Sequence, residues 1–177
     1  ACRETDHVPI LDRTVIAGLP PFEGLQPDDL DRVLELARSS RYPRESVVFA
    51  QDAEATSFFL LLDGHVRVVR MTPEGEQIIS RYINAGEMFG LAVAMARTTY
   101  PATAIAAVDC VVISWPNSAW ADLSRRFPSF GTSTYRTIGK WLQETHTRML
   151  EMVTSQVEQR VAHALLRLAH QAGRKTA

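Results

Sequence analysis

The interpretation of this chain depends on two segments near its middle, Gly86-Glu87-Met88-Phe89-Gly90-Leu91 and Tyr100-Pro101-Ala102-Thr103-Ala104-Ile105-Ala106. In the first, the apolar residues Met88 and Phe89 stand between two glycines, shortly after the chain-breaking group Asn84-Ala85-Gly86. In the second, residues 102–106 have the small and β-branched side chains of a buried strand. Both segments therefore belong to a part of the chain that we expect to be rich in β-structure.

Further strands are predicted on both sides of these segments, at residues 46–50, 57–62, 66–71, 77–83 and 110–115. Breakers separate them, among them Pro73-Glu74-Gly75 and Asp63-Gly64. Because Asp63-Gly64 lies between two apolar runs, it predicts a tight hairpin turn. Many short strands at fairly even spacing are typical of an antiparallel barrel or jelly roll.

Helices are predicted before and after this region. A short one covers residues 11–17, and Pro27-Asp28-Asp29-Leu30 opens another with proline and acidic residues in its first turn. After residue 116 we expect a helix to about residue 126 and a long helix over 129–153. Ser155-Gln156-Val157-Glu158 then has the form of a capping box, which predicts one more helix, ending near Gly173.

The long helix carries an apolar seam with the spacing of a coiled coil. Its members recur at alternating steps of three and four residues: Tyr135, Ile138, Leu142, Thr145, Met149 and Met152. Such a stripe can also pack on the chain's own barrel. Trp141 makes a second apolar edge, so we expect one edge to face the barrel and the other to form a parallel homodimer. Thr145 would weaken the seam and leave room for adjustment.

Composition excludes several classes of protein. Apolar residues make up 46% of the 177 residues and the net charge is −1, so a real core is expected and a nucleic-acid clamp by this chain alone is not. Two cysteines cannot make a disulfide framework, a Cys-rich zinc site or a four-cysteine cluster. No apolar run is long enough to span a bilayer and no signal core is seen, so we expect a cytoplasmic protein without a membrane partner.

The order of these elements resembles the Crp/Fnr superfamily of transcription regulators. Similar motifs are Val48-Phe49-Ala50-Gln51-Asp52, Phe59-Leu60-Leu61-Leu62-Asp63-Gly64, Thr72-Pro73-Glu74-Gly75-Glu76, Gly86-Glu87-Met88-Phe89-Gly90 and Ala102-Thr103-Ala104. The resemblance extends over residues 15–173. It is nearest to the NnrR and DNR branches, the nitric-oxide-responsive denitrification regulators, which share the Thr-Pro-Glu-Gly turn and the start of the helix at Val157.

The resemblance implies an α+β fold, a cyclic-nucleotide-binding-type antiparallel β-roll (jelly roll) with short flanking helices and a long C-terminal dimerisation helix. It divides the chain into a loose N-terminus (1–10), an effector-sensing roll (11–128), a dimerisation helix (129–153) and a hinge with the first helix toward a DNA-binding domain (155–177). DNA would bind through a winged helix-turn-helix that we expect outside these residues.

The cassette that holds the phosphate in nucleotide-binding relatives lacks its polar groups here. Relatives have a Glu, an Arg and a Ser or Thr where the alignment places Leu91, Tyr100 and Pro101. A buried phosphate needs a cation and donors, and losing them lowers affinity by about two decades or more. Arg97, three residues before Tyr100, is the one nearby replacement we consider. We therefore expect no cyclic nucleotide.

An apolar pocket remains, and the resemblance implies that haem and nitric oxide are its ligands. Its predicted lining is Met88, Phe89, Leu91, Met95, Tyr100, Pro101, Ala102, Trp141, Leu142 and Thr145. His146, beside Trp141 on the long helix, is the first candidate for an axial ligand of haem iron, and His65, after the Asp63-Gly64 turn, is the second.

Other functions stay open. The roll could sense a cyclic nucleotide through altered contacts, or it could be a constitutive dimerisation module whose pocket is filled by its own side chains. A small cupin-like enzyme is a further alternative, but no paired metal-ligand motif, nucleophile elbow or Walker loop is present. Cys110, at the start of an apolar strand, is expected to be a buried structural thiol rather than a nucleophile. We therefore expect a sensor and not an enzyme.

Overall fold

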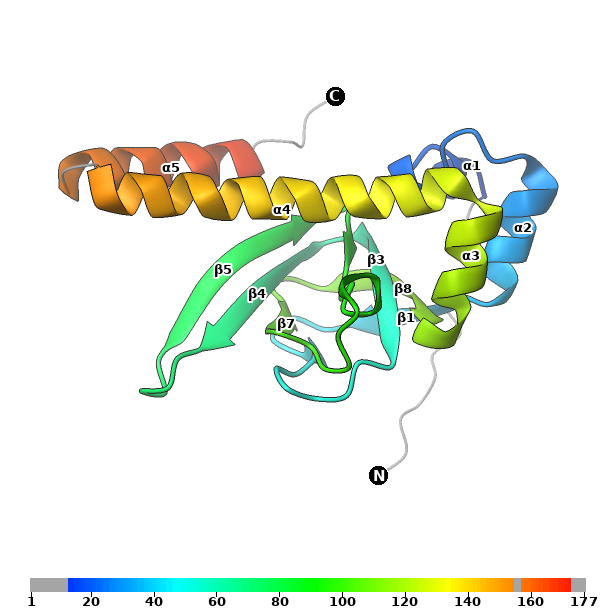
Figure 1. The fold of residues 1–177 in the computed structure, drawn as a ribbon, viewed down its shortest axis with the longest axis horizontal. Helices are drawn as coiled ribbons and strands as arrows, with labels where there is room; N and C mark the ends of the chain where they lie inside the picture. The colour runs from blue at the N-terminus through cyan, green and yellow to red at the C-terminus, as the bar shows by residue number, and fades with distance from the viewer. Residues whose placement is uncertain (1–12, 155–156, 173–177) are drawn as a thin grey trace. The chain divides into compact units, whose positions relative to one another are not determined.

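A computed structural model describes residues 13–154 and 157–172 of the chain (Figure 1). The chain divides into two compact units after Tyr135. The first unit contains all the strands and the short helices, and the second contains most of helix α4 (Pro128–Thr154) together with helix α5 (Val157–Ala172). No helix within the described ranges is both long and apolar enough to cross a membrane.

The first unit is a roll of two four-stranded antiparallel sheets. One sheet has the order β1 (Arg38–Tyr42), β8 (Cys110–Pro116), β3 (Ser57–Asp63) and β6 (Met88–Phe89). The other has the order β2 (Val47–Phe49), β7 (Thr103–Ala106), β4 (His65–Met71) and β5 (Gln77–Asn84). The core lies between the sheets, where Leu60, Val66 and Ile83 are fully buried. The predicted antiparallel β-roll is therefore confirmed.

Two strands were missing from the sequence-based prediction. Strand β1, with the sequence RSSRY, has no alternation of apolar residues, because it lies at a sheet edge and pairs only with β8. Strand β6 has two residues, and only its pairing with Phe59 and Leu60 of β3 identifies it. The six strands that were predicted are all present, with ends shifted by at most one residue.

The prediction of a hairpin at Asp63-Gly64 was wrong. Strands β3 and β4, which this dipeptide connects, belong to different sheets and do not pair with each other. Gly64 has φ +94°, and a Cβ there would lie 2.5 Å from the carbonyl oxygen of Asp109. Glycine is required because the chain turns a corner between the sheets while another backbone segment approaches closely.

Short helices precede, interrupt and follow the strands of the roll. They are α1 (Arg13–Ala17), η1 (Pro20–Phe22), α2 (Pro27–Glu35), η2 (Val93–Met95), η3 (Asn117–Ala119) and α3 (Trp120–Arg126). As predicted, α2 begins at Pro27 with Asp28 and Asp29 in its first turn. It buries Leu30 and Val33, and its Val33 carbonyl accepts a 2.8 Å hydrogen bond from the Trp115 indole on β8.

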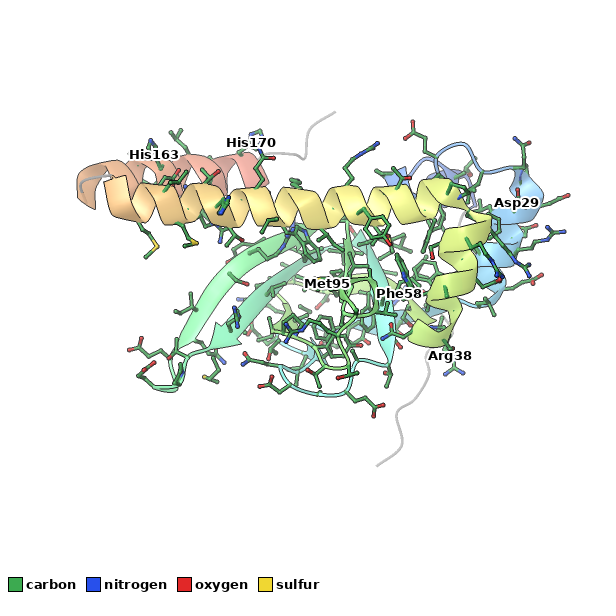
Figure 2. The ribbon with its side chains drawn as sticks, viewed as in Figure 1. Asp29, Arg38, Phe58, Met95, His163 and His170 are labelled. Carbon is green, nitrogen blue, oxygen red and sulfur yellow. The ribbon has the colours of Figure 1, made fainter. Side chains whose placement is uncertain are left out.

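Helix α4 begins inside the core of the first unit. The Phe130 side chain is fully buried, and its ring centroid lies 6.0 Å from those of Phe58 and Trp115 and 6.2 Å from that of Phe22. Figure 2 shows Phe58 among the packed side chains of the roll. The first turns of α4 are therefore held by the same aromatic core as the strands. The predicted long helix is confirmed; the expected loose N-terminus lies outside the described residues.

Replacement of Gly64 by alanine tests the sheet-changing corner. We expect Gly64→Ala to lower the free energy of unfolding by about 2–4 kcal/mol, because left-handed strain adds to the contact with Asp109. Gly75→Ala is the matched control, since Gly75 has φ +85° but a Cβ there would meet nothing within 4 Å. It should cost about 1 kcal/mol. Equal losses in urea unfolding would show that the close approach contributes nothing.

Candidate effector pocket

The glycine-bounded step of the cassette folds as strand β6 against β3. Gly86, with φ +86°, donates its backbone N–H to the carbonyl of Leu61 at 2.7 Å, which aligns Met88 with Leu60 and Phe89 with Phe59. Gly90 has φ +65°, and a Cβ there would lie 2.6 Å from the Phe59 ring. Both glycines are thus needed for a turn that places the following segment against the core.

The second half of the cassette is fixed by a facing loop. Tyr100 donates its backbone N–H to Ala53 at 3.0 Å, and its carbonyl accepts from Asp52 at 2.8 Å. Ala55 bonds to the carbonyl of Thr98 at 2.8 Å, and a bridge pairs Glu54 with Thr99. These bonds set the position at which Tyr100 enters the roll.

The Tyr100 side chain points into the roll and is only 3% exposed. Its hydroxyl donates to the Ser57 carbonyl at 2.7 Å and accepts from the Ser57 N–H at 3.1 Å. In register, Ser57 faces Pro116, which has no backbone N–H to donate, and the tyrosine hydroxyl supplies that donor. Burial raises the pKa of Tyr100 above its usual value, so the neutral phenol is the stable form.

Tyr100 is part of a cluster of four aromatic rings between the sheets, which we call the aromatic cluster: Phe49, Phe59, Phe89 and Tyr100. The rings of Phe49 and Tyr100 stack with centroids 4.0 Å apart, and the Phe59 ring lies 5.4 Å from Phe49 and 5.2 Å from Phe89. The Tyr100 position is therefore occupied by packed aromatic carbon and not by a charged group.

Seven of the ten residues of the predicted pocket lining lie in the first unit. Five of those residues are buried core of the first unit: Met88, Phe89, Leu91, Tyr100 and Ala102. Met95 and Pro101 are half-buried in the same unit. Trp141, Leu142 and Thr145 belong to the second unit, where Trp141 is half-buried and Leu142 is 66% exposed. That these three line the same pocket stays a prediction.

Sequence reasoning missed three features of this region. The apolar strands at residues 46–50 and 57–62 contained Phe49 and Phe59, but their contact with the cassette depends on strand order. Arg81 was missed as well: β5 pairs it with Val68, on the same face as the buried Ile83. Its Nε and Nη1 atoms are inaccessible to solvent. Arg97 is exposed.

The side chains at the cassette that can bind haem iron are already engaged. The Tyr100 hydroxyl bonds to Ser57, and the Met88 sulfur accepts from the Thr134 hydroxyl at 3.4 Å. The His65 ring lies 3.1 Å from the Asn84 side-chain oxygen. As packed here, the cassette does not fit a haem. His146 is exposed on α4 in the second unit, and the described residues contain no cluster of three or more metal-binding side chains.

The contact between Met88 and Thr134 joins the cassette to helix α4. Thr134 is fully buried, and its single hydroxyl proton is shared between the Met88 sulfur and the Phe130 carbonyl oxygen, which lies 3.1 Å from Oγ1. Ser133 beside it is 8% exposed. A displacement of β6 would therefore press directly on the first turns of α4.

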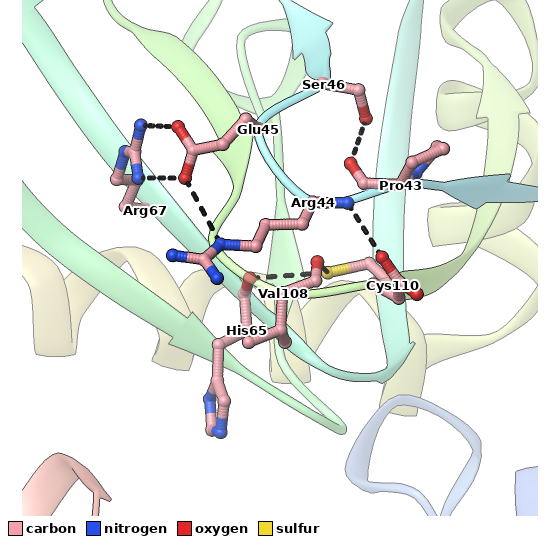
Figure 3. A network of polar contacts seen from close by, with 9 residues as sticks. Pro43, Arg44, Glu45, Ser46, His65, Arg67, Val108 and Cys110 are labelled. Carbon is pink, nitrogen blue, oxygen red and sulfur yellow. Dashed lines mark hydrogen bonds and ion pairs between the residues drawn. The ribbon is translucent and has the colours of Figure 1, made fainter.

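A polar network lies near the starts of β2, β4 and β8 (Figure 3). Arg67 donates two hydrogen bonds to Glu45, at 2.8 and 2.5 Å, and these lower the pKa of Glu45. The Arg44 backbone N–H donates to Asp109 at 2.8 Å. Cys110 is buried, as predicted, and burial raises the pKa of its thiol. This network is structural and lacks an activated nucleophile.

Comparisons of the sequence with known proteins agree on one family. A family model of the cyclic nucleotide-binding domain matches residues 39–127, about half of the chain. The cyclic AMP receptor protein of Thermus thermophilus is 26% identical over 87% of this chain and 71% of its own length.

Two solved structures share the fold. The c-di-GMP-responsive regulator CLP of Xanthomonas campestris has a TM-score of 0.70 at 16% identity, over 85% of this chain and 76% of that one. The sensor domain of the regulator DNR from Pseudomonas aeruginosa has a TM-score of 0.62 at 23% identity, over 82% and 93% of the two chains. Proteins with this roll are thus described with different nucleotide effectors.

Removal of the Tyr100 hydroxyl tests its structural role. We expect Tyr100→Phe to lower the free energy of unfolding by about 1–3 kcal/mol, because both backbone groups of Ser57 lose a partner while the stacked ring stays. The control is Thr98→Val, which removes an exposed hydroxyl in the neighbouring loop, and it should change the value by less than about 0.5 kcal/mol. Equal effects in urea unfolding would contradict the assignment.

The same variant has a signature in alkaline solution. Because the folded protein raises the pKa of Tyr100 above 10.0, its contribution is fully present below that pH and is lost as the pH rises through the folded value. Tyr100→Phe should therefore lose less stability than the wild type on moving above about pH 10. Comparing both proteins at each pH cancels the part due to Cys110.

Proposed function

This chain belongs to the cyclic nucleotide-binding domain family, and we propose that it is the sensing and dimerisation part of a Crp/Fnr-type transcription regulator whose signal is not a cyclic nucleotide. Its relatives are transcription regulators, which supports a sensor over an enzyme. The regulator as a whole would bind DNA as a homodimer.

The aromatic cluster is the observation that carries the effector proposal. A cyclic phosphate bound in the cassette would need charge-assisted donors, and the Tyr100 hydroxyl is already occupied in both directions by Ser57. Leu91, at the place of the ribose-binding Glu, is 1% exposed. Making room for a phosphate would mean opening a packed core without gaining an ion pair.

Exposed residues of the predicted seam support the dimer. Leu142, Met149 and Met152 are 66%, 59% and 68% exposed. Large apolar side chains repeated at heptad spacing on one helix face are typical of a helix–helix interface. We propose that two copies of α4 pair in parallel along this seam.

A two-state mechanism follows for the proposed sensor. An effector with unequal affinity for two arrangements of the roll shifts their populations. The contact between Met88 and Thr134 passes a displacement of the cassette to the first turns of α4. The pitch of the two paired α4 helices then changes. Because α4 ends at Thr154 and α5 follows from Val157, this change reaches α5.

Arg81 favours a second candidate function, a nucleotide sensor with altered contacts. Its Nε and Nη1 atoms are shielded from solvent on β5, on the same face as the buried Ile83, and a guanidinium is a strong partner for a phosphate. A constitutive dimer whose pocket is filled by the aromatic cluster is the third candidate. The three differ in whether they bind anything and in the class of ligand.

Haem is the effector that the resemblance to the nitric-oxide-responsive branch puts first, and it would have to bind outside the packed cassette, which does not fit it. Bound haem would supply an iron that binds nitric oxide. Because the cassette is packed, we propose His146 as the axial ligand, since its side chain is exposed on α4. His65, engaged with Asn84, is the weaker candidate.

One titration series tests the effector class. The chain is titrated by calorimetry with cAMP, cGMP and c-di-GMP, and by absorbance with haemin before and after addition of nitric oxide. We expect no nucleotide to bind with a Kd below about 100 µM, which is some two decades weaker than a micromolar site. A Soret band that shifts with nitric oxide and is lost in His146→Ala supports the haem proposal, with His170→Ala as the control.

Each other outcome selects a competing function. Micromolar nucleotide binding that is lost in Arg81→Met would favour the altered-contact sensor. Binding of neither class would favour the constitutive dimer.

Replacement of Leu142 by glutamate tests the seam. A charge at the centre of the proposed interface should weaken the dimer at least about tenfold, because it would be desolvated without a partner. Thr147→Glu is the control, since Thr147 is exposed on α4 outside the seam. Sedimentation velocity at micromolar concentration measures the monomer–dimer equilibrium of both variants. A monomeric wild type, or equal dissociation of the two variants, would contradict the seam.

A further inference from the structure

We propose that Glu151 acts as an ionic latch that holds α5 folded back along α4, and that opening of this latch controls the orientation of α5. The proposal rests on the proposed sensor function for its purpose, but its evidence lies in the second unit alone. There, the Glu151 carboxylate near the end of α4 pairs with Arg167 and lies 3.7 Å from the His163 ring, both on α5. Figure 2 shows His163 on α5 beside α4.

These pairs can form only when the chain reverses between the helices. Glu151 and Arg167 are 16 residues apart. If α4 and α5 were one straight helix, their Cα atoms would be separated by about 24 Å along the axis. Instead α4 ends at Thr154 and α5 begins at Val157, so that the two cations return to the carboxylate. The ion pair therefore reports the folded-back arrangement and no other.

Both cations lie on one face of α5. His163 and Arg167 are four residues apart, which places them one above the other on a helix. The Glu151 side chain is 20% exposed, against 36% for Arg167 and 48% for His163. A partly shielded carboxylate with a cation that is always charged makes a stronger contact than a fully exposed pair.

The described apolar residues of α4 and α5 contribute little to holding the two helices together. On α5, Val161, Leu165 and Leu166 are 55%, 62% and 67% exposed, and on α4 the neighbouring Met149 and Leu150 are 59% and 64% exposed. These side chains do not form a buried seam between the helices. The balance between folded-back and extended α5 should therefore respond to the loss of a single charge.

Such a balance has a direct use in a sensor. A shift of α4 that moves Glu151 by a few ångströms would break a contact whose partners must lie within hydrogen-bonding distance. The released α5 could then swing away from α4. The latch thus converts a small movement of one helix into a large reorientation of the next.

Spin labels can measure the latch in the whole chain without any effector. Labels are attached at Gln143→Cys on α4 and Ala169→Cys on α5, after replacement of Cys2 and Cys110 by serine and alanine, and the labelled chain is diluted with unlabelled chain. In the folded-back form the two labels lie on neighbouring helices, whose axes pack about 10 Å apart. In a straight helix the sites would be about 39 Å apart. Electron paramagnetic resonance separates the two populations.

We expect Glu151→Gln to lower the ratio of folded-back to extended chains roughly two- to fivefold, the effect of losing a partly shielded ion pair. The matched control is Glu144→Gln, two turns earlier on α4, whose carboxylate lies 4.0 Å from Lys140 within the same helix. It should leave the ratio unchanged. Glu151→Arg alone should remove the short distance. The double variant Glu151→Arg with Arg167→Glu, which exchanges the two charges, should restore it.

The proposal is overturned if Glu151→Gln keeps the wild-type distances, or if Glu144→Gln changes them equally. Absence of any short distance in the wild type would overturn it as well. None of these results depends on an effector, so the latch and the sensor proposal can fail separately.

Discussion

The roll depends on the burial of the aromatic cluster between its two sheets. Gly90 can carry no side chain because Phe59 lies against it, and Tyr100 can enter only because Ser57 satisfies its hydroxyl from both directions. A charged side chain at position 100 would find aromatic rings and no anion, which is costly in a dry interior. The four rings therefore form packed core at this position, with no charged side chain among them.

The same packing gives the roll a mechanical connection to α4. Met88 precedes the ring of Phe89 and touches Thr134, while Phe130 one turn earlier is surrounded by aromatic side chains. A well-packed core transmits a displacement because it has little free volume to absorb it. At the opposite end of α4 the apolar residues of the seam are exposed and Glu151 forms ion pairs with α5. This end can therefore adopt alternative arrangements.

Much of the fold could be predicted because the strands alternate with clear breakers and the long helix has a regular period. The errors have local causes. Strand β1 has no apolar pattern at a sheet edge, and Gly64 has the neighbours of a hairpin glycine although it turns the chain between sheets. For the site, the apolar residues of the cassette were predicted, whereas Arg81 was not, because one Arg in a strand does not reveal its face until the register is known.

The sequence by itself determined six of the strands, the long helix, the uncharged residues at positions 91, 100 and 101, and the heptad spacing along α4, since these follow from local pattern and residue identity. Only the tertiary structure decided that Tyr100 fills its own site against Ser57 and Phe49, and that α5 folds back onto Glu151. Such contacts join residues far apart in the chain. They depend on which strands and helices become neighbours, and local sequence carries little information about that choice.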